Sequence, residues 1–184
     1  MKIIKYYPQI FKASAFILAG AVLSACGSST DSESETGITP VVDYCEHTVE
    51  GVNWDALLNN NCAKLSHYNL FTDATDPTSG ANENGIPYDL STPLFTDYAS
   101  KYRFVFVPEG KSATYSDHEV MEFPLGTVLV KTFAMPADTA ERSVNETVIE
   151  TRLLINRADG WTSLPYYWDA ADDASYIVTG ETIG

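Results

Sequence analysis

The chain has no run of about twenty apolar residues, the length that a membrane-spanning helix needs. Its most apolar stretch, AFILAGAVLSA at residues 15–25, would extend only about 16 Å as a helix, against about 30 Å of bilayer hydrocarbon. Lys2, Lys5 and Lys12 precede this stretch, and small residues end it, which is the layout of a secretory signal. We therefore expect residues 1–25 to be an export signal and not a permanent membrane span.

The sequence also lacks the short signatures of common enzyme classes. It has no Gly-x-Ser-x-Gly nucleophile motif, no His-Glu-x-x-His zinc motif and no phosphate-binding loop. Ser66 and His67 are adjacent, but adjacency in sequence does not make a nucleophile and its base. A hydrolase acting on surface polymers would need converging acids or a nucleophile, and no such pair is visible. The sequence therefore predicts no catalytic residues.

Basic residues are scarce: the chain has 11 Lys and Arg against 25 Asp and Glu, a net charge of −14. Residues 1–25 contain three of the lysines and no acid, so the rest of the chain carries a net charge of −17. Such a charge repels nucleic acid and anionic lipid headgroups, and we expect neither as a partner. It is compatible with a basic protein partner or divalent cations, although it also serves simply to keep an exported protein soluble.

Cysteine is rare as well, and its count of three is odd. The first cysteine ends the stretch LSAC, residues 23–26, which resembles the bacterial lipobox. That resemblance implies cleavage before Cys26 and a diacylglycerol on its thiol; Gly27, in place of Asp, implies the periplasmic face of the outer membrane. Each buried CH₂ of such chains contributes about 0.8 kcal/mol to membrane binding. The alternative is an ordinary signal that leaves Cys26 free or paired.

The other two cysteines, Cys45 and Cys62, are 17 residues apart in a chain that we expect to enter an oxidising compartment. We predict that they form a disulfide, and closing a loop of this size stabilises by roughly 3 kcal/mol in the chain-entropy model. A metal site with His47 and His67 is an alternative, but the spacing matches no common zinc pattern. A pair of free thiols is the third possibility.

The remaining sequence divides into a tether and one domain. Residues 26–40, CGSSTDSESETGITP, are rich in Ser, Thr, Gly and acids and contain little to bury, so we expect a flexible tether. Residues 41–184 are long enough for one domain with a sizeable core.

Hydrophobic periodicity indicates the fold class of this domain. Residues 53–68 have apolar residues at helical spacing behind a potential Asn53 cap, and residues 71–87 form a polar loop. Period-two or β-branched stretches follow at residues 101–108, 126–135, 150–168 and 174–180, and the third is divided by the turn sequence RADG. We predict a mainly β fold, an antiparallel β-sandwich or barrel with one short N-terminal helix.

Several polar and aromatic clusters leave further possibilities open. Acidic loops could bind Ca²⁺, but neither matches an EF-hand, and such loops are usually only solvated; they contain Asp73, Asp76, Asn82, Glu83, Asn84, Asp169, Asp172 and Asp173. The segment LPYYWD, residues 164–169, could stack on a sugar ring, although Tyr and Trp on strands are usually core residues. His118, Met121 and Met135 could ligate a haem, but they fit solvated or packing positions better.

Five stretches together resemble one bacterial family: residues 53–71, 85–110, 122–138, 150–169 and 179–183. They are similar to the leading half of exported c-type cytochrome-like lipoproteins, which are found beside parallel β-helix repeat proteins. The resemblance implies a periplasmic redox role, a parallel β-helix partner and a haem site, Cys-x-x-Cys-His, in a later part. That motif is absent here. We therefore expect a chain truncated at its C-terminal end, with no metal or cofactor site of its own.

Two functions from different classes follow. The first is a lipid-anchored envelope protein that carries the non-haem β-domain of a cytochrome c-like redox protein. The second is a non-catalytic, acidic binding or scaffold domain on a lipid anchor, with no redox role.

Overall fold

The computed structural model describes residues 42–83, 85–169 and 174–176. The expected export signal, the tether and Cys26 therefore lie outside the described residues. No helix in the described part of the chain is both long and apolar enough to cross a bilayer.

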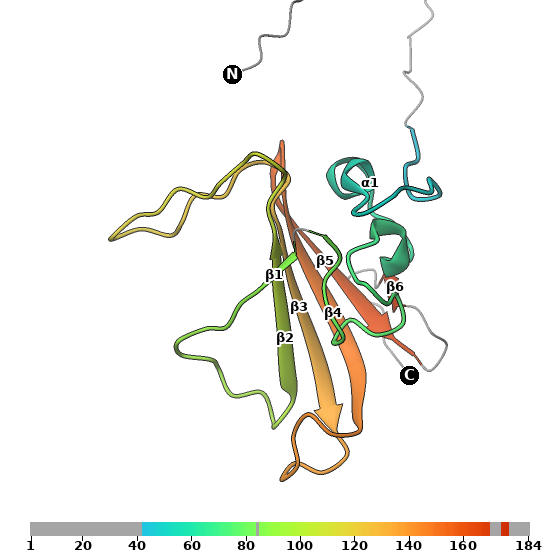
Figure 1. The fold of residues 1–184 in the computed structure, drawn as a ribbon, viewed down its shortest axis with the longest axis vertical. Helices are drawn as coiled ribbons and strands as arrows, with labels where there is room; N and C mark the ends of the chain where they lie inside the picture. The colour runs from blue at the N-terminus through green and yellow to red at the C-terminus, as the bar shows by residue number, and fades with distance from the viewer. Residues whose placement is uncertain (1–41, 84, 170–173, 177–184) are drawn as a thin grey trace, which may run out of the picture. The chain divides into compact units, whose positions relative to one another are not determined.

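The described strands form one antiparallel sheet in which every strand pairs with its neighbours in sequence (Figure 1). The strands are β1 (Gly85–Pro87), β2 (Ser100–Phe106), β3 (Val128–Pro136), β4 (Glu146–Arg157), β5 (Gly160–Trp168) and β6 (Ala174–Tyr176). The mainly β, antiparallel fold with a short helix is confirmed. The sheet is open, with β1 and β6 at its two edges, and is not closed into a barrel.

The turn sequence RADG connects β4 to β5 as predicted. Arg157 pairs with Gly160, and Gly160 has a φ of +119°, a value that side-chain-bearing residues rarely adopt. Asp159 and Gly160 therefore supply the turn chemistry that the hairpin needs. The strand near residues 126–135 is confirmed as β3, and only the start of the expected strand at residues 174–180 is described, as β6.

Strand β1 was not predicted, because it lies at the end of the polar stretch 71–87. Gly85 pairs with Phe106, and a Cβ at Gly85 would lie 2.7 Å from the Phe106 ring. Pro87 lacks an N–H and is typical of an edge strand. The strand is therefore set by close packing of its backbone against β2, which periodicity does not reveal.

The predicted helix over residues 53–68 is in fact two shorter elements, α1 (Trp54–Asn59) and the 3₁₀-helix η1 (Leu65–Tyr68). Asn53 caps α1 as predicted, since its Oδ1 accepts a hydrogen bond from Ala56 N at 3.1 Å. The helix stops because Asn60 is extended, and Cys62 N then donates to the Tyr68 hydroxyl at 2.8 Å instead of to a helical carbonyl. The short helix is therefore α1, and the rest of the helical spacing belongs to a turn and to η1.

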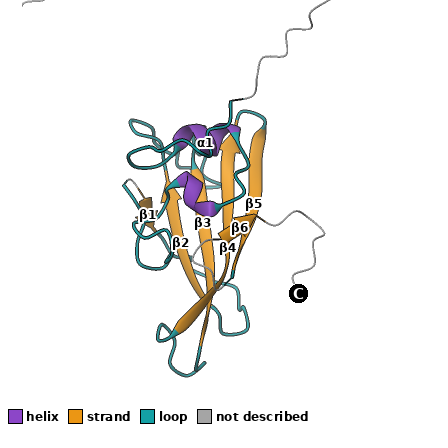
Figure 2. Cartoon of the chain, turned by 90° about the vertical axis from the view of Figure 1, so that its right-hand side faces the viewer, coloured by secondary structure: helices purple, strands orange, loops and turns teal. Residues whose placement is uncertain are grey.

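The two helical elements cover one face of the sheet (Figure 2). Between them and the strands lies the core, and alternate residues of β2–β5 point into it. Its larger members are Leu57, Leu65, Tyr68, Leu70, Phe104, Phe106, Val128, Val130, Leu153, Ile155, Leu164 and Tyr166. Burying each such side chain contributes roughly 1.5–3 kcal/mol relative to exposure, so the sheet and the helical layer stabilise each other.

Two buried threonine hydroxyls on the same face are paired. Thr132 on β3 faces Thr151 on β4, with their oxygens 2.8 Å apart, and Trp168 Nε1 donates to Thr151 Oγ1 at 2.9 Å. These contacts satisfy groups whose burial would otherwise be costly. They also fix the ring of Trp168 against the sheet.

Candidate functional site

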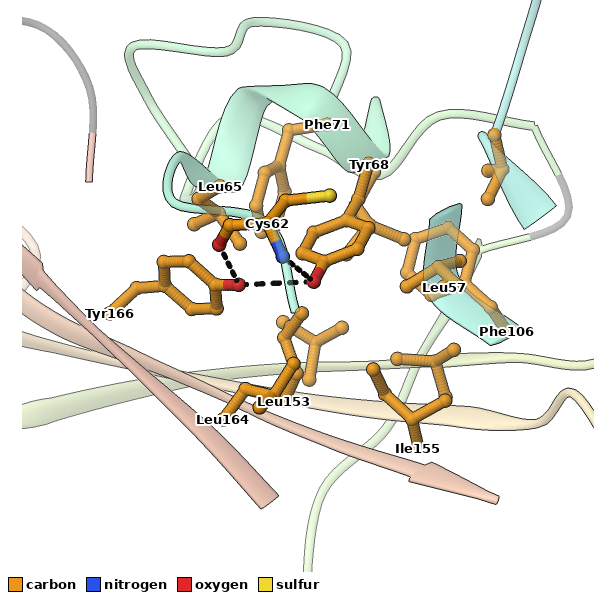
Figure 3. Close-up of a cluster of buried hydrophobic side chains, with 14 of the residues drawn as sticks. Leu57, Cys62, Leu65, Tyr68, Phe71, Phe106, Leu153, Ile155, Leu164 and Tyr166 are labelled. Atoms are coloured by element: carbon orange, nitrogen blue, oxygen red, sulfur yellow. Dashed lines mark hydrogen bonds between the residues drawn. The ribbon is translucent and has the colours of Figure 1, made fainter. Parts of the chain in front are cut away.

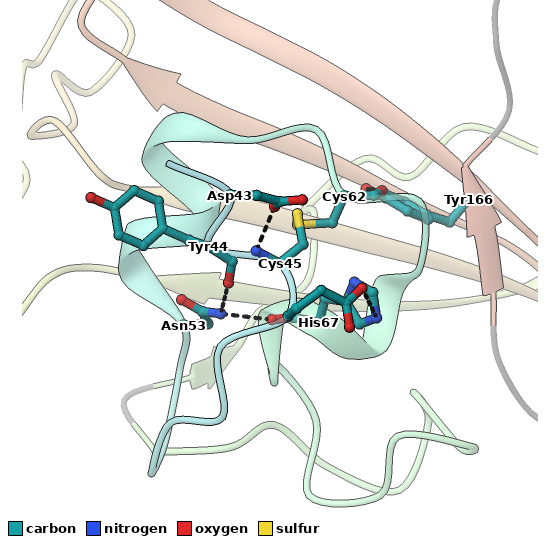
Figure 4. Close-up of polar contacts among 8 residues, drawn as sticks. Asp43, Tyr44, Cys45, Asn53, Cys62, His67 and Tyr166 are labelled. Atoms are coloured by element: carbon teal, nitrogen blue, oxygen red, sulfur yellow. Dashed lines mark hydrogen bonds and ion pairs between the residues drawn. A yellow bond between two sulfur atoms is a disulfide. The ribbon is translucent and has the colours of Figure 1, made fainter. Parts of the chain in front are cut away.

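The two cysteines of the predicted pair, Cys45 and Cys62, are joined by a disulfide in the structure, with their Cα atoms 5.5 Å apart (Figure 4). The disulfide links the segment that leads into the domain to the turn between α1 and η1. Beside it, Asn53 Nδ2 donates to the backbone oxygens of Tyr44 and His67, each at 3.0 Å. The same asparagine therefore caps α1 and fixes the backbone at Tyr44, next to Cys45, and at His67.

The two histidines of the metal alternative differ in position. His67 offers a ring nitrogen to a group with the two cysteine sulfurs, all within 4.8 Å of one another. His47 does not belong to that group; its ring packs edge-on against Tyr44, with centroids 5.3 Å apart. The structure thus brings one of the two predicted histidines to the cysteine pair.

Beneath the disulfide, two tyrosines meet inside the core (Figure 3). The Tyr166 hydroxyl donates to Cys62 O at 2.8 Å and lies 3.1 Å from the Tyr68 hydroxyl, which donates to Asn60 O at 3.0 Å. Burial raises the pKa of Tyr68 above its ordinary value, against the lowering effect of its hydrogen bonds. The Tyr68 phenol therefore stays neutral at physiological pH.

The aromatic segment 164–169 is mostly core. Leu164, Tyr166 and Trp168 are buried, while Pro165 and Tyr167 alternate onto the other face. The usual assignment of these rings to the core is confirmed for Tyr166 and Trp168, which are not available to stack on a ligand.

In the acidic loop, Asp73 and Asp76 use their carboxylates locally. Asp73 Oδ1 accepts hydrogen bonds from the backbone and hydroxyl of Thr75, and Asp76 Oδ1 does the same with Thr78. The hydroxyl of Thr75 is the main cause of the lowered pKa of Asp73. These contacts build turns, and among the described residues the metal-type cluster is at Cys45, Cys62 and His67. Asn84, Asp172 and Asp173 lie outside the described residues.

The candidate haem ligands of the sequence lie on β3 and on the connection before it. Cys45 and Cys62 are tied to each other, and His118 and Met121 lie exposed on the connection between β2 and β3. Met135 is on β3, on the face opposite the core, where it is half-buried.

The face of the sheet opposite the core carries a row of cations that the sequence analysis did not single out. Arg103 on β2 faces Lys131 on β3, and Lys131 faces Arg152 on β4. Like charges directly opposite one another across strands destabilise a sheet. With Lys101 and Arg142, this row accounts for five of the eight basic residues after residue 25. Positive charge is therefore concentrated here in an acidic chain. We call these five residues the cationic surface; Arg103 is its buried member, with 6 % of the residue exposed.

Only part of this charge is neutralised. Arg152 forms a bidentate pair with Glu150, at 2.6 and 2.9 Å, and Arg103 Nη1 lies 3.3 Å from Asp89 Oδ1. Within the described part of the chain, Lys131 has no carboxylate within 4 Å. Burial, followed by the nearby positive charges, lowers its pKa.

An aromatic ring lies among these cations. The Phe133 centroid is 4.5 Å from Lys131 Nζ and 5.2 Å from the Arg152 guanidinium carbon. Such cation–π contacts hold the long side chains over the sheet and reduce their freedom. The cations are therefore partly ordered before any partner binds.

Next to the row is a small pocket, about 330 Å³ in volume, lined by Lys101, Arg103 and Arg142 and by exposed apolar side chains of the β1–β2 loop. Phe95 and Tyr98 meet edge-on at its rim, with centroids 5.2 Å apart. Tyr98 has a φ of +68°, which is strained for an aromatic residue. Among the described residues, no carboxylate lines this pocket.

At the opposite end of the same face is an apolar groove of about 520 Å³. It is lined by Leu129, Leu154, Trp161 and residues 120–123 of the β2–β3 connection. Trp161 is 45 % exposed, and its ring contacts Phe123 edge-on with centroids 6.2 Å apart. The face therefore combines an apolar groove with a cationic surface.

Comparisons with known proteins identify no relative. A scan against models of protein families found no match, and neither did searches of curated proteins and of solved structures.

Proposed function

We propose that the chain is a non-catalytic docking domain of the cell envelope, anchored through Cys26, and that its open sheet face holds an acidic protein partner. The observation that carries this proposal is the row Arg103–Lys131–Arg152 in direct cross-strand register on a chain of net charge −14. Repulsion within the row opposes folding, and an acidic partner would relieve it.

A protein partner suits this face better than a small anion does. Trp161, Phe133 and Arg152 are of the types enriched at protein interfaces, and they lie on a sheet surface with an apolar groove beside the charges. An apolar anchor of the partner would enter the groove, and its carboxylates would lie over the cationic surface. The complementary charges would mainly raise the association rate and select the partner.

The docking surface is tested by crosslinking in cells. A photo-crosslinking phenylalanine analogue at Ser163, an exposed position in the row of Leu129 and Leu154, should yield a crosslinked product with another protein. Lys131→Glu should remove that product, whereas Lys111→Glu, the same charge change in an exposed loop, should leave it unchanged. Equal yields in both variants, or a crosslink only within the chain, would contradict the proposal.

Membrane attachment is tested separately. Wild-type protein should incorporate labelled palmitate and sediment with outer membranes, and Cys26→Ala should do neither. Palmitate labelling and sedimentation that persist in Cys26→Ala would show that the anchor is elsewhere. Because membrane attachment does not depend on the sheet face, the proposed anchor and the proposed docking surface can be contradicted independently.

The redox role implied by the cytochrome-like resemblance stays a prediction. It would place the docking domain beside a haem-bearing part or partner in the envelope. The absorbance of the complex isolated from its native envelope decides the matter: a haem spectrum that co-purifies with the chain supports the redox role, and a colourless complex removes it.

A further inference from the structure

The disulfide has a histidine beside it that its structural role does not require. The sulfurs of Cys45 and Cys62 and a ring nitrogen of His67 lie within 4.8 Å of one another. Two thiolates and an imidazole are ligands that Zn²⁺ prefers, at about 2.3 Å for sulfur and about 2.0 Å for nitrogen. Tetrahedral bonds of these lengths place ligand atoms roughly 3.5 Å apart. The two sulfurs must therefore move apart once their bond is broken, while the His67 ring is already within 4.8 Å of both.

The two ring nitrogens of His67 are in different environments. Nε2 lies 3.8 Å from Glu46 Oε1, while Nδ1 is buried and has no hydrogen-bond partner among the described residues. A buried polar nitrogen without a partner is uncommon in folded proteins. A metal-bound histidine characteristically presents its other nitrogen to a carboxylate, which fixes the tautomer and orients the ring. Glu46 is placed to do this.

The cluster is both held in place and accessible. Asn53 binds the backbone oxygen of His67, and the Cys45 amide donates to Asp43 Oδ1 at 2.9 Å, so the backbone around the ligands is fixed. A cavity of about 370 Å³ lies beside the disulfide, lined by Cys45, Glu46, His47 and His67. A hydrated cation therefore has a route from solvent to Cys45 and to the imidazole of His67.

We propose that Cys45, Cys62 and His67 form a redox-gated site for a divalent metal of the zinc type, closed while the disulfide is present and open once it is reduced. A dithiol reductant opens the site by exchange: it becomes a disulfide, and its two hydrogens pass to the sulfurs of Cys45 and Cys62. The metal then displaces both thiol protons and binds two thiolates and His67. Water completes the tetrahedron.

Co²⁺ is the probe, because tetrahedral thiolate coordination gives it intense near-ultraviolet charge-transfer and visible bands. The full chain, solubilised in a mild detergent, is compared before and after reduction by a phosphine. The phosphine takes oxygen from water to become its oxide and delivers two protons and two electrons to the disulfide. We expect one equivalent of Co²⁺ to bind the reduced chain only, and Zn²⁺ to displace it and to raise the melting temperature of the reduced chain.

Three variants test whether the site needs His67 and Glu46 or only the two thiols. His67→Asn and Glu46→Gln should weaken Co²⁺ binding by about 10- to 100-fold, and His67→Asn should also change the visible bands. His47→Asn, in the same cavity wall, should bind like wild type. The proposal is overturned if the reduced chain shows no charge-transfer bands and no rise in melting temperature with Zn²⁺, if His67→Asn binds as tightly as wild type, or if His47→Asn loses binding equally.

Discussion

The hydroxyl oxygens of Tyr68 and Tyr166 lie 3.1 Å apart in the core, although the two residues are 98 positions apart in sequence. Tyr68 is in η1 and Tyr166 is on β5, so the pair joins the helical layer to the sheet. Tyr166 also donates to Cys62 O, and Tyr68 accepts from Cys62 N. The two phenols therefore satisfy the backbone of a buried disulfide cysteine that belongs to no regular element.

Tyr166→Phe should lower the free energy of unfolding by about 1–2 kcal/mol. The substitution keeps the ring in the core but leaves Cys62 O without its phenol donor, and an unsatisfied buried acceptor is costly. Urea unfolding measures the change. Tyr167→Phe, on the opposite face of β5, is the matched control and should change stability by less than about 0.5 kcal/mol. Similar losses in both variants would show that the Tyr166 hydroxyl has no special role.

Reduction of the Cys45–Cys62 disulfide should destabilise the domain by roughly 3 kcal/mol, since the unfolded chain regains the entropy of a 17-residue loop. Thermal unfolding with and without reductant, in the absence of metal, measures this. The double variant Cys45→Ala/Cys62→Ala should unfold near the reduced wild type and be insensitive to reductant. If thiol titration of the non-reduced, denatured chain finds both cysteines free, the pairing is wrong.

The parts of the fold that sequence predicted are those set by local patterns. Alternation in residues 101–108 and the Asp159–Gly160 turn predicted β2 and the β4–β5 hairpin, because period and turn chemistry act over a few residues. The interruption between α1 and η1 depends on Tyr68, which captures Cys62 N through its side chain. That contact forms only when the tertiary structure is in place, so helical spacing alone gave one helix.

The cationic surface could have been found in part from sequence. Lys101, Arg103, Lys131 and Arg152 all occupy the strand positions that alternate away from the core. Their direct apposition depends on the register of three strands, and a shift of one residue would move each side chain to the other face. Net charge pointed to basic partners, because summing over the chain hides a local cluster of opposite sign.

Arg157→Lys should lower the free energy of unfolding by about 1.5–3 kcal/mol. The Arg157 guanidinium donates to Leu57 O, Asn60 O and Asn61 Oδ1 at 2.7–2.8 Å, and so ties the end of α1 to the end of β4. A lysine keeps the charge but cannot reproduce the planar fork that reaches all three acceptors.

The matched control for Arg157 is Arg152→Lys. Arg152 is also on β4, but it is exposed and pairs with Glu150 at the surface, so its replacement should cost less than about 1 kcal/mol. Urea unfolding of both variants, with far-ultraviolet circular dichroism to follow the helical content, makes the comparison. Equal costs would contradict the bridging role of Arg157.

Protonation of Glu146 should make the domain less stable in acid. Burial alone would raise the pKa of its carboxyl, but hydrogen bonds from Ser100, Tyr102 and the backbone of Ser143 outweigh it and hold the pKa below the ordinary 4.5. With a lower pKa in the folded state than in the unfolded one, Glu146 contributes stability above about pH 4.5, and this is lost as the pH falls through the folded pKa.

Glu146→Gln should therefore lower the free energy of unfolding at pH 7 and make it depend less on pH below about 4.5. The free energies of unfolding of the variant and the wild type should become similar in acid. The same hydrogen bonds hold the start of β4 against the start of β2 and the turn at Ser143, so amide exchange there should quicken in the variant at neutral pH. Urea midpoints across the acid range make the measurement, with Glu141→Gln in the same loop as the control. A difference between wild type and Glu146→Gln that does not narrow with falling pH would mean that packing, not the carboxylate charge, is responsible.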